Sequence, residues 1–186
     1  MFATSILFDQ CPGGAVQAAV KALAERPPEM GLSYPCNAGW RYWALSKAGR
    51  ADVVIEDLRR RWAVMPSVVL NNTLQEDWTV RSDSSSQWSH CALAPLFVLF
   101  MDIAGIRPTA PGFSRCQIRP QLGDLGQLSL TAQTVRGPIQ FDAQAERGGH
   151  QIRVSLPAGC AGKALAGLKR HRIEPGQTVE FRTSAT

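Results

Sequence analysis

The stretch Ile-Arg-Pro-Thr-Ala-Pro-Gly-Phe at residues 106–113 divides the sequence into two parts with different hydrophobic patterns. Before it, apolar residues recur three and four positions apart, and after it they alternate with polar residues. The first spacing is typical of amphipathic helices and the second of half-buried strands. A chain of 186 residues has room for two small domains. We therefore predict an α+β fold, with helical hairpins over residues 1–108 followed by an antiparallel β-sandwich over residues 109–186.

The first part contains four segments with a helical stripe of apolar residues, separated by glycine and proline. The predicted helices cover residues 14–25, 37–48, 50–63 and 88–104. Connections of this length join antiparallel neighbours. Aromatic residues fall on more than one side of these helices, which predicts that other helices or a second copy of the chain cover them, so we expect a homo-oligomer. These residues are Trp40, Tyr42, Trp43, Trp62, Trp78 and Trp88.

The second part contains five segments in which apolar and polar residues alternate. They cover residues 117–119, 128–131, 139–142, 152–156 and 179–182. Turn signals at residues 136–138, 148–149 and 157–159 fall between them. This spacing is typical of a sandwich of antiparallel strands.

Composition excludes several classes of protein. Apolar residues make up 45% and charged residues 19%, which is a globular balance rather than a disordered one. The five cysteines are widely spaced, with no C-x-x-C pair and no nearby histidine, so we expect free thiols in a reducing compartment and no metal site. No cofactor-binding motif is present either, and no cofactor is expected.

The N-terminus and the most apolar segment both predict where the protein is located. The N-terminus has no basic residue before its short apolar stretch and soon meets Asp9, unlike a secretory signal. The most apolar segment, residues 91–106, is shorter than the roughly 20 residues of a membrane-spanning helix and contains Asp102. We expect a cytoplasmic protein without a membrane partner.

The basic excess lies in the second part of the chain. The net charge is +5, yet acidic and basic residues balance over residues 1–108. The cluster Lys-Arg-His-Arg at residues 169–172 could contact phosphates within a basic stretch, residues 163–172. No aromatic residue interleaves it, so we expect a solvated turn between two strands and no nucleic-acid partner.

The stretch Thr-Leu-Gln-Glu-Asp-Trp at residues 73–78 places two carboxylates beside an aromatic ring. Glycosidases need such groups, because two carboxylates flank the scissile bond and one of them activates water. The same spacing fits a capping box, in which Thr73 and Glu76 exchange hydrogen bonds at the start of a helix. Both interpretations remain open at this point.

The stretch Ser-Ser-Ser-Gln-Trp-Ser-His at residues 84–90 opens the last predicted helix. His90 would then lie in the first turn, where the helix dipole favours a neutral imidazole that can hydrogen-bond a sugar hydroxyl. The alternative is a polar residue that satisfies the N–H groups at the helix start.

Taken in order, eight segments of this chain resemble the C-terminal end of bacterial α-L-rhamnosidase-like glycoside hydrolases. The resemblance covers nearly the whole chain. The matching segments are residues 40–52, 60–65, 73–78, 89–90, 104–108, 111–113, 118–125 and 137–139.

The resemblance implies that residues 1–108 are the last helical hairpins of an (α/α)6 toroid and that a β-sandwich follows. It also implies a rhamnose-containing glycoside as partner and an inverting mechanism in which Glu76 is the general base. His90 would contact the sugar, and Trp78 and Trp88 would be candidates for stacking on its ring.

The sequence departs from this family in the upstream acidic segment that provides the general acid, which has no counterpart here. An inverting enzyme needs two carboxyl groups roughly 6.5 to 9.5 Å apart, so we expect the isolated chain to be inactive. Gln75 and Cys91 stand where the family usually has aromatic residues. The alternative function is a non-catalytic carbohydrate-binding or interaction module. The genomic DNA upstream of Met1 would show whether a longer reading frame exists.

Overall fold

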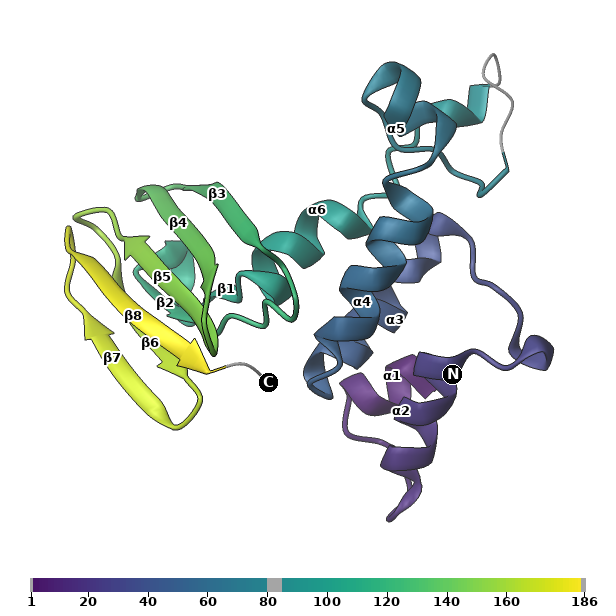
Figure 1. Cartoon of the computed structure of the whole chain (residues 1–186), viewed down its shortest axis with the longest axis horizontal. Helices are drawn as coiled ribbons and strands as arrows, with labels where there is room; N and C mark the ends of the chain where they lie inside the picture. The colour runs from purple at the N-terminus through teal and green to yellow at the C-terminus, as the bar shows by residue number, and fades with distance from the viewer. Residues whose placement is uncertain (1, 80–84, 185–186) are drawn as a thin grey trace. The chain divides into compact units, whose positions relative to one another are not determined.

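The computed structural model describes residues 2–79 and 85–184. The chain divides into two compact units, Met1–Val98 and Leu99–Thr186 (Figure 1). Helices make up the first unit and strands dominate the second, so the predicted α+β class is confirmed. The division falls ahead of the boundary expected after residue 108, because β1 (Ile106–Pro108) pairs with β2 (Arg115–Ile118) in the second unit.

The first unit is a set of short helices around a central one, α3 (Pro35–Lys47). Proline at the first position of α3 is suited to a helix start, and Gly49 just after its end has a positive φ of 77°. Tyr42 and Leu45 of α3 are fully buried. The other helices of this unit are α1 (Phe2–Leu7), α2 (Ala15–Glu25), α4 (Ala51–Asp57), α5 (Pro66–Asn71) and α6 (Ala94–Val98). Single turns complete it: η1 (Pro28–Met30), η2 (Leu58–Trp62) and η3 (Ser85–Gln87).

Three of the four predicted helices are confirmed closely, as α2, as α3, and as α4 continued by η2. The fourth is wrong in its first half. Helix α6 begins at Ala94 instead of residue 88, because Ser89 Oγ accepts the N–H groups of Cys91 and Ala92 and holds residues 89–92 in a turn. Helical geometry then continues through η4 (Leu99–Ile103). Helices α1 and α5 were not predicted.

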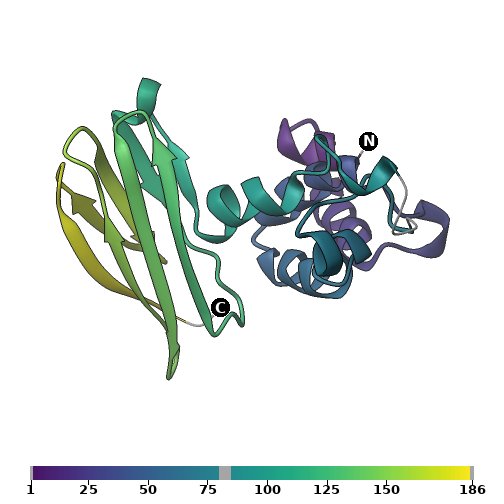
Figure 2. The same ribbon diagram turned by 90° about the horizontal axis from the view of Figure 1, so that it is seen from above.

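The second unit contains two four-stranded sheets. Figures 1 and 2 show the strands of this unit from two directions. One has the order β1-β2-β6-β7 and the other the order β3-β4-β5-β8. All pairs are antiparallel except β2 and β6, which run parallel. The expectation of a purely antiparallel sandwich is therefore wrong at this one pair. The remaining strands are β3 (Gln127–Thr134), β4 (Gly137–Glu146), β5 (Gly149–Ser155), β6 (Ala161–Ala166), β7 (Lys169–Ile173) and β8 (Thr178–Ser184).

Period-two alternation builds the core of the second sheet. Phe141 lies opposite Val154, and Ile152 lies opposite Phe181, all buried. On the other face Arg153 lies opposite Glu180, both exposed. A shift by one residue would bring these charges into the core, so the hydrophobic pattern fixes the register.

The basic cluster at residues 169–172 is in strand β7 and not in a turn, which corrects the expectation from sequence. Strand β7 is an edge strand, and Lys169, Arg170 and Arg172 are exposed. Charged side chains on an edge strand discourage pairing with other chains. The position on an edge strand therefore gives this cluster of positive charge a structural role.

All five cysteines are free thiols, as expected. In the second unit the sulfurs of Cys116 and Cys160 lie 3.6 Å apart in the core. Burial, followed by the neighbouring thiol, raises the pKa of Cys116 to about 12. This thiol therefore stays protonated and unreactive at neutral pH.

Candidate functional site

Residues 73–78 form an irregular loop beside the segment that contains η3. The backbone N–H of Glu76 donates to the carbonyl oxygen of Ser86 at 2.8 Å, and the N–H of Ser89 donates to that of Leu74 at 2.8 Å. The capping-box interpretation is wrong, because no helix begins at Thr73 and the Glu76 N–H is bonded to Ser86. Ser84, the first residue of the predicted 84–90 stretch, lies outside the described residues.

Gln75 holds this loop in place and is fully buried. Its Oε1 accepts the backbone N–H of Ser67 at 3.2 Å, and its Nε2 donates to the carbonyl oxygens of Asp77 at 2.7 Å and Trp78 at 3.3 Å. Sequence reasoning noted Gln75 only as a departure from the family. The available signal was a polar residue at a position where an aromatic core residue is usual.

The carboxylate of Glu76 is exposed and lies next to a thiol. Its Oε1 is 4.0 Å from Cys91 Sγ, which in turn is 3.2 Å from Ser89 Oγ. Cys36 belongs to the same neighbourhood, since partial burial, the Cys91 thiol and the Glu76 carboxylate all raise its pKa. An exposed carboxylate can accept a proton from water, which is the task of a general base.

His90 and Trp88 line a cavity of about 500 Å³ in the first unit. The indole of Trp88 is 61% exposed. His90 precedes α6 by several residues, so the prediction that it lies in the first turn of this helix is wrong. The same cavity is also lined by Asn72, Thr73, Leu74, Ser89, Leu93 and Leu96. Glu76 is not among its lining residues.

Trp78 faces a different cavity. Its Nε1 donates to the carbonyl oxygen of Ser33 at 2.7 Å, and its ring packs edge-on against Trp62 with centroids 5.2 Å apart. The guanidinium of Arg61 lies over the same ring, 5.7 Å from its centroid. Of the four predicted site residues, the structure therefore brings His90 and Trp88 into one cavity, with Glu76 on the neighbouring loop and Trp78 elsewhere.

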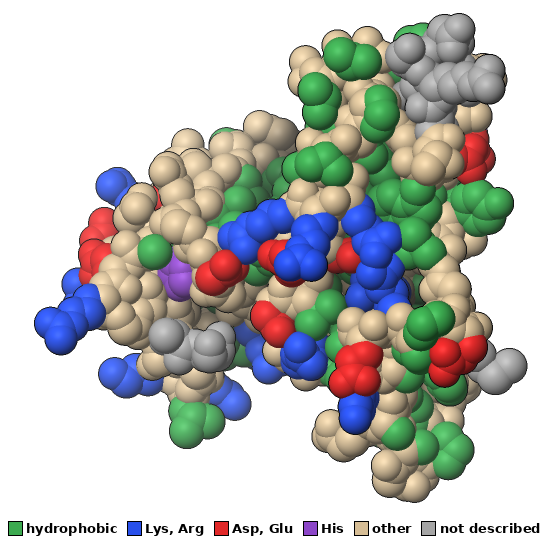
Figure 3. Space-filling view, turned by 45° about the vertical axis from the view of Figure 1, so that its right-hand side comes forward, with side chains coloured by type: hydrophobic (Ala, Val, Ile, Leu, Met, Phe, Trp, Pro, Cys, Tyr) green, Lys and Arg blue, Asp and Glu red, His purple; other side chains and the backbone are tan. Residues whose placement is uncertain are grey.

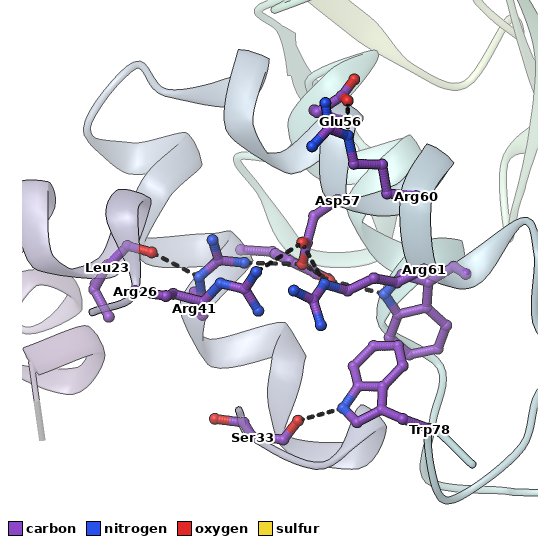
Figure 4. A network of polar contacts seen from close by, with 11 residues as sticks. Leu23, Arg26, Ser33, Arg41, Glu56, Asp57, Arg60, Arg61 and Trp78 are labelled. Carbon is purple, nitrogen blue, oxygen red and sulfur yellow. Dashed lines mark hydrogen bonds and ion pairs between the residues drawn. The ribbon is translucent and has the colours of Figure 1, made fainter. Parts of the chain in front are cut away.

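A buried carboxylate, Asp57, organises the polar interior of the helical unit (Figure 4). Its Oδ2 accepts hydrogen bonds from Arg41 Nη1 at 2.9 Å and Tyr42 OH at 2.7 Å, and its Oδ1 accepts one from Arg61 Nε at 2.8 Å. Arg26 Nη2 lies 3.7 Å from Oδ1. Burial alone would raise the pKa of Asp57, but the Tyr42 hydrogen bond and the three guanidinium charges hold it below its usual range.

Sequence reasoning missed this network, which joins helices α2, α3 and α4. The only signal was a set of charged residues next to apolar helical stripes. The described residues contain no group of three or more His, Cys, Asp or Glu side chains placed to hold a metal ion. Within the same described ranges, no helix combines the length and apolarity needed to cross a membrane.

Known proteins share this combination of a helical unit followed by a two-sheet unit. Residues 105–180 match the family model for the bacterial α-L-rhamnosidase C-terminal domain. A comparison with curated protein sequences gives no match.

Solved structures extend the similarity to both units. The α-L-rhamnosidase of Aspergillus terreus has a TM-score of 0.78 and 21% identity, over 98% of this chain and 23% of that one. The Streptomyces avermitilis α-L-rhamnosidase, solved with L-rhamnose, has a TM-score of 0.76 and 18% identity, over 98% and 21%. A GH78 family rhamnosidase of Bacillus sp. GL1 has a TM-score of 0.69 and 22% identity, over 88% and 18%.

The resemblance inferred from the sequence is thus confirmed, and the chain is similar to the C-terminal part of α-L-rhamnosidases. The chain spans about a fifth of the length of these solved structures.

Proposed function

We propose that this chain is the C-terminal portion of a glycoside hydrolase that cleaves terminal α-L-rhamnosides with inversion, and that Glu76 is its general base. The observation that carries this proposal is the exposed Glu76 carboxylate on a loop fixed by buried Gln75 and by two backbone hydrogen bonds to the neighbouring segment. A base needs a fixed position, because water must be held in line with the anomeric carbon.

The neighbouring cavity supplies the sugar contacts in this proposal. The imidazole of His90 hydrogen-bonds a rhamnose hydroxyl, and the exposed indole of Trp88 stacks on an apolar face of the ring. We assign stacking to Trp88 in preference to Trp78, since the Trp78 ring is packed against Trp62. In this proposal the leaving group takes its proton from a second carboxyl group, which a longer gene product would supply.

The first test measures hydrolysis of 4-nitrophenyl α-L-rhamnoside by the chain. We expect no release above a buffer control, because general acid and base catalysis each contribute roughly a hundredfold or more and the acid is missing. Turnover that disappears in Glu76→Gln would contradict the expected inactivity. In a longer gene product, if the upstream DNA encodes one, Glu76→Gln should lower kcat at least about a hundredfold at unchanged Tm.

The second candidate is a carbohydrate-binding module without chemistry, and one observation favours it. The wall that holds His90 and the exposed Trp88 does not include Glu76. Tryptophan fluorescence during titration with L-rhamnose separates the two candidates. Both predict weaker binding in Trp88→Ala and in His90→Ala, with Trp40→Phe as the control in another cavity. Only the module predicts that Glu76→Gln leaves every activity of the longer gene product intact.

Exposed apolar side chains on the helical unit are part of the same proposal. They include Val64, Val69, Leu70, Trp88 and Leu96, and Figure 3 shows hydrophobic side chains on the surface. Patches of this kind mark surfaces that bind another protein or another part of the same protein. We expect light scattering to find a dimer or a larger species of the isolated chain. A compact monomer would favour a self-sufficient module.

A further inference from the structure

The helical unit has a second cavity, of about 490 Å³, that the proposed function does not use. Most of its lining is apolar or aromatic, and one part of its wall is polar. The apolar part includes Phe2, Leu23, Met30, Leu32, Trp40 and Trp78. The polar lining residues include Arg26, Arg41, Tyr42 and Asp57. A cavity of this size with a few convergent polar groups is typical of small-molecule sites.

The donors of Arg26 are not satisfied by the carboxylate beside it. Asp57 already accepts hydrogen bonds from Arg41, Tyr42 and Arg61. Arg26 Nη2 lies 3.7 Å from Oδ1, which is beyond hydrogen-bond distance. Arg26 Nε is buried and has no hydrogen-bond partner. A buried donor without an acceptor is costly, and it indicates a group that is supplied from elsewhere.

The charge at this wall is also unbalanced. Two guanidinium groups of the wall, those of Arg26 and Arg41, lie beside the single carboxylate of Asp57, which also pairs with Arg61 outside the cavity lining (Figure 4). The side chains of Arg26 and Arg41 are 20% and 11% exposed, so solvent compensates their charge only in part. An anion in the cavity would supply the missing negative charge next to Arg26.

The backbone of Arg26 is unusual at this position. The residue caps the C-terminus of α2 with φ 48° and ψ 71°, in the left-handed region where glycine is the usual residue. A side chain with a Cβ is unfavourable there. The chain nevertheless has arginine at the position that lines the cavity.

We propose that this cavity binds a carboxylate carried on a ring, with Arg26 as the residue that pairs with the carboxylate. A guanidinium matches a carboxylate in a two-point hydrogen bond, and the free Nε is one of the donors that such a pair uses. The indole of Trp40 in the same wall, a residue that is 44% exposed, provides the flat apolar surface for the ring. Aryl carboxylates and uronic acids share this chemistry.

The test titrates benzoate and D-glucuronate into the full chain and follows tryptophan fluorescence, with benzyl alcohol and D-glucose as the neutral controls. We expect saturable binding of at least one carboxylate and none of the neutral compounds. Binding of benzoate alone identifies an aryl carboxylate site, and binding of D-glucuronate alone identifies a sugar-acid site. No saturation by either carboxylate, or equal binding of its neutral control, would overturn the proposal.

Two variants separate a binding role of Arg26 from a structural one. Arg26→Gly removes the side chain and suits the positive φ, so we expect affinity to fall at least tenfold while Tm stays the same or rises. Arg26→Gln keeps a polar side chain and should lose the same affinity, which covers a failure of the glycine variant to fold. Arg60→Gln, at an exposed residue paired with Glu56, is the control and should bind as wild type. Unchanged affinity in either Arg26 variant would overturn the proposal.

Discussion

Gln75 Oε1 accepts a hydrogen bond from the backbone N–H of Ser67 at 3.2 Å, so the residue directly before Glu76 is attached to the first turn of α5. The first N–H groups of a helix have no partner inside it, and α5 begins with a proline, which has no N–H at all. A buried amide satisfies one of them and, through its other end, fixes the loop that carries Glu76.

This arrangement predicts opposite outcomes at two adjacent residues. Gln75→Leu leaves the Ser67 N–H and the Asp77 carbonyl without this partner, so we expect the free energy of unfolding to fall by roughly 2 to 4 kcal/mol. Glu76→Gln changes only an exposed group and should stay within about 0.5 kcal/mol of wild type. Urea unfolding of both variants is the measurement, and equal losses in the two would contradict the assignment.

Asp57 is the centre of the polar network, and its removal leaves buried guanidinium groups unpaired. We expect Asp57→Ala to lower the free energy of unfolding by about 3 to 5 kcal/mol. Asp52→Asn is the matched control, since Asp52 forms an exposed pair with Arg50, and it should cost about 1 kcal/mol or less. A small effect in Asp57→Ala would show that the network adds little to stability.

The raised pKa of Asp102 predicts that the free energy of unfolding depends on pH. Burial raises the pKa of Asp102 to about 6, although the adjacent Arg107 guanidinium lowers it, and Oδ2 has no hydrogen-bond partner. Because the folded pKa exceeds the unfolded value of about 3.9, this contribution to stability is complete below pH 4 and is lost as pH rises through 6.

The Asp102→Asn variant isolates this contribution from those of other groups. We expect the stability of wild type relative to the variant to fall by about 2 kcal/mol between pH 4 and pH 7.5. Chemical unfolding of both proteins at several pH values measures the difference. A difference that stays constant over this range would mean that the carboxyl group keeps its ordinary pKa.

Gly105 lies where the chain cannot accept a side chain. Its φ is +72°, and an added Cβ would be 2.0 Å from the carbonyl oxygen of Arg119. We expect Gly105→Ala to cost at least about 2 kcal/mol of stability. Gly126→Ala is the control, because its Cβ would meet no atom within 4 Å, and it should change stability by about 0.5 kcal/mol or less. If both variants lowered Tm by the same amount, the close approach of Gly105 to the Arg119 carbonyl oxygen would be refuted.

The start of the second domain can be located with two shortened chains. A chain that begins at Leu99 keeps β1, whereas one that begins at Thr109 loses β1 and buried Ile106 and exposes the edge of β2. We expect the shorter chain to be less stable by roughly 3 kcal/mol. Equal thermal melts of the two would support the boundary after residue 108 that the sequence predicts.

The strands that sequence patterns predicted are those with one face in the core, because burial of one face produces the alternation. Strand β1 was not predicted, and strands β6 and β7 were missed for physical reasons. Strand β6 contains Gly162, where a Cβ would be 2.7 Å from Leu156 Cδ1, so small residues replace the usual apolar signal. Strand β7 is an edge strand that buries only Ile173, and its charges hide the pattern.

The candidate site was predictable in part. The resemblance selects Glu76 and His90, and the structure places them on neighbouring segments. The roles of Gln75 and Asp57 could not be predicted, because each depends on burial and on hydrogen-bond partners that the local sequence pattern does not reveal. A charged or amide residue has the same local pattern whether it faces water or a buried partner.

The parallel pairing of β2 and β6 has a consequence for the order of folding. Strand β2 ends at Ile118, but its parallel neighbour starts at Ala161, and β3, β4 and β5 lie between them in the chain. These three strands follow one another through two-residue connections and can pair as soon as they are synthesised. The sheet that contains β1 must wait for β6, since closing the longer loop costs more entropy. During synthesis, β1 and β2 therefore lack their parallel neighbour at least until β6 has left the ribosome, which happens after residue 166 has been added.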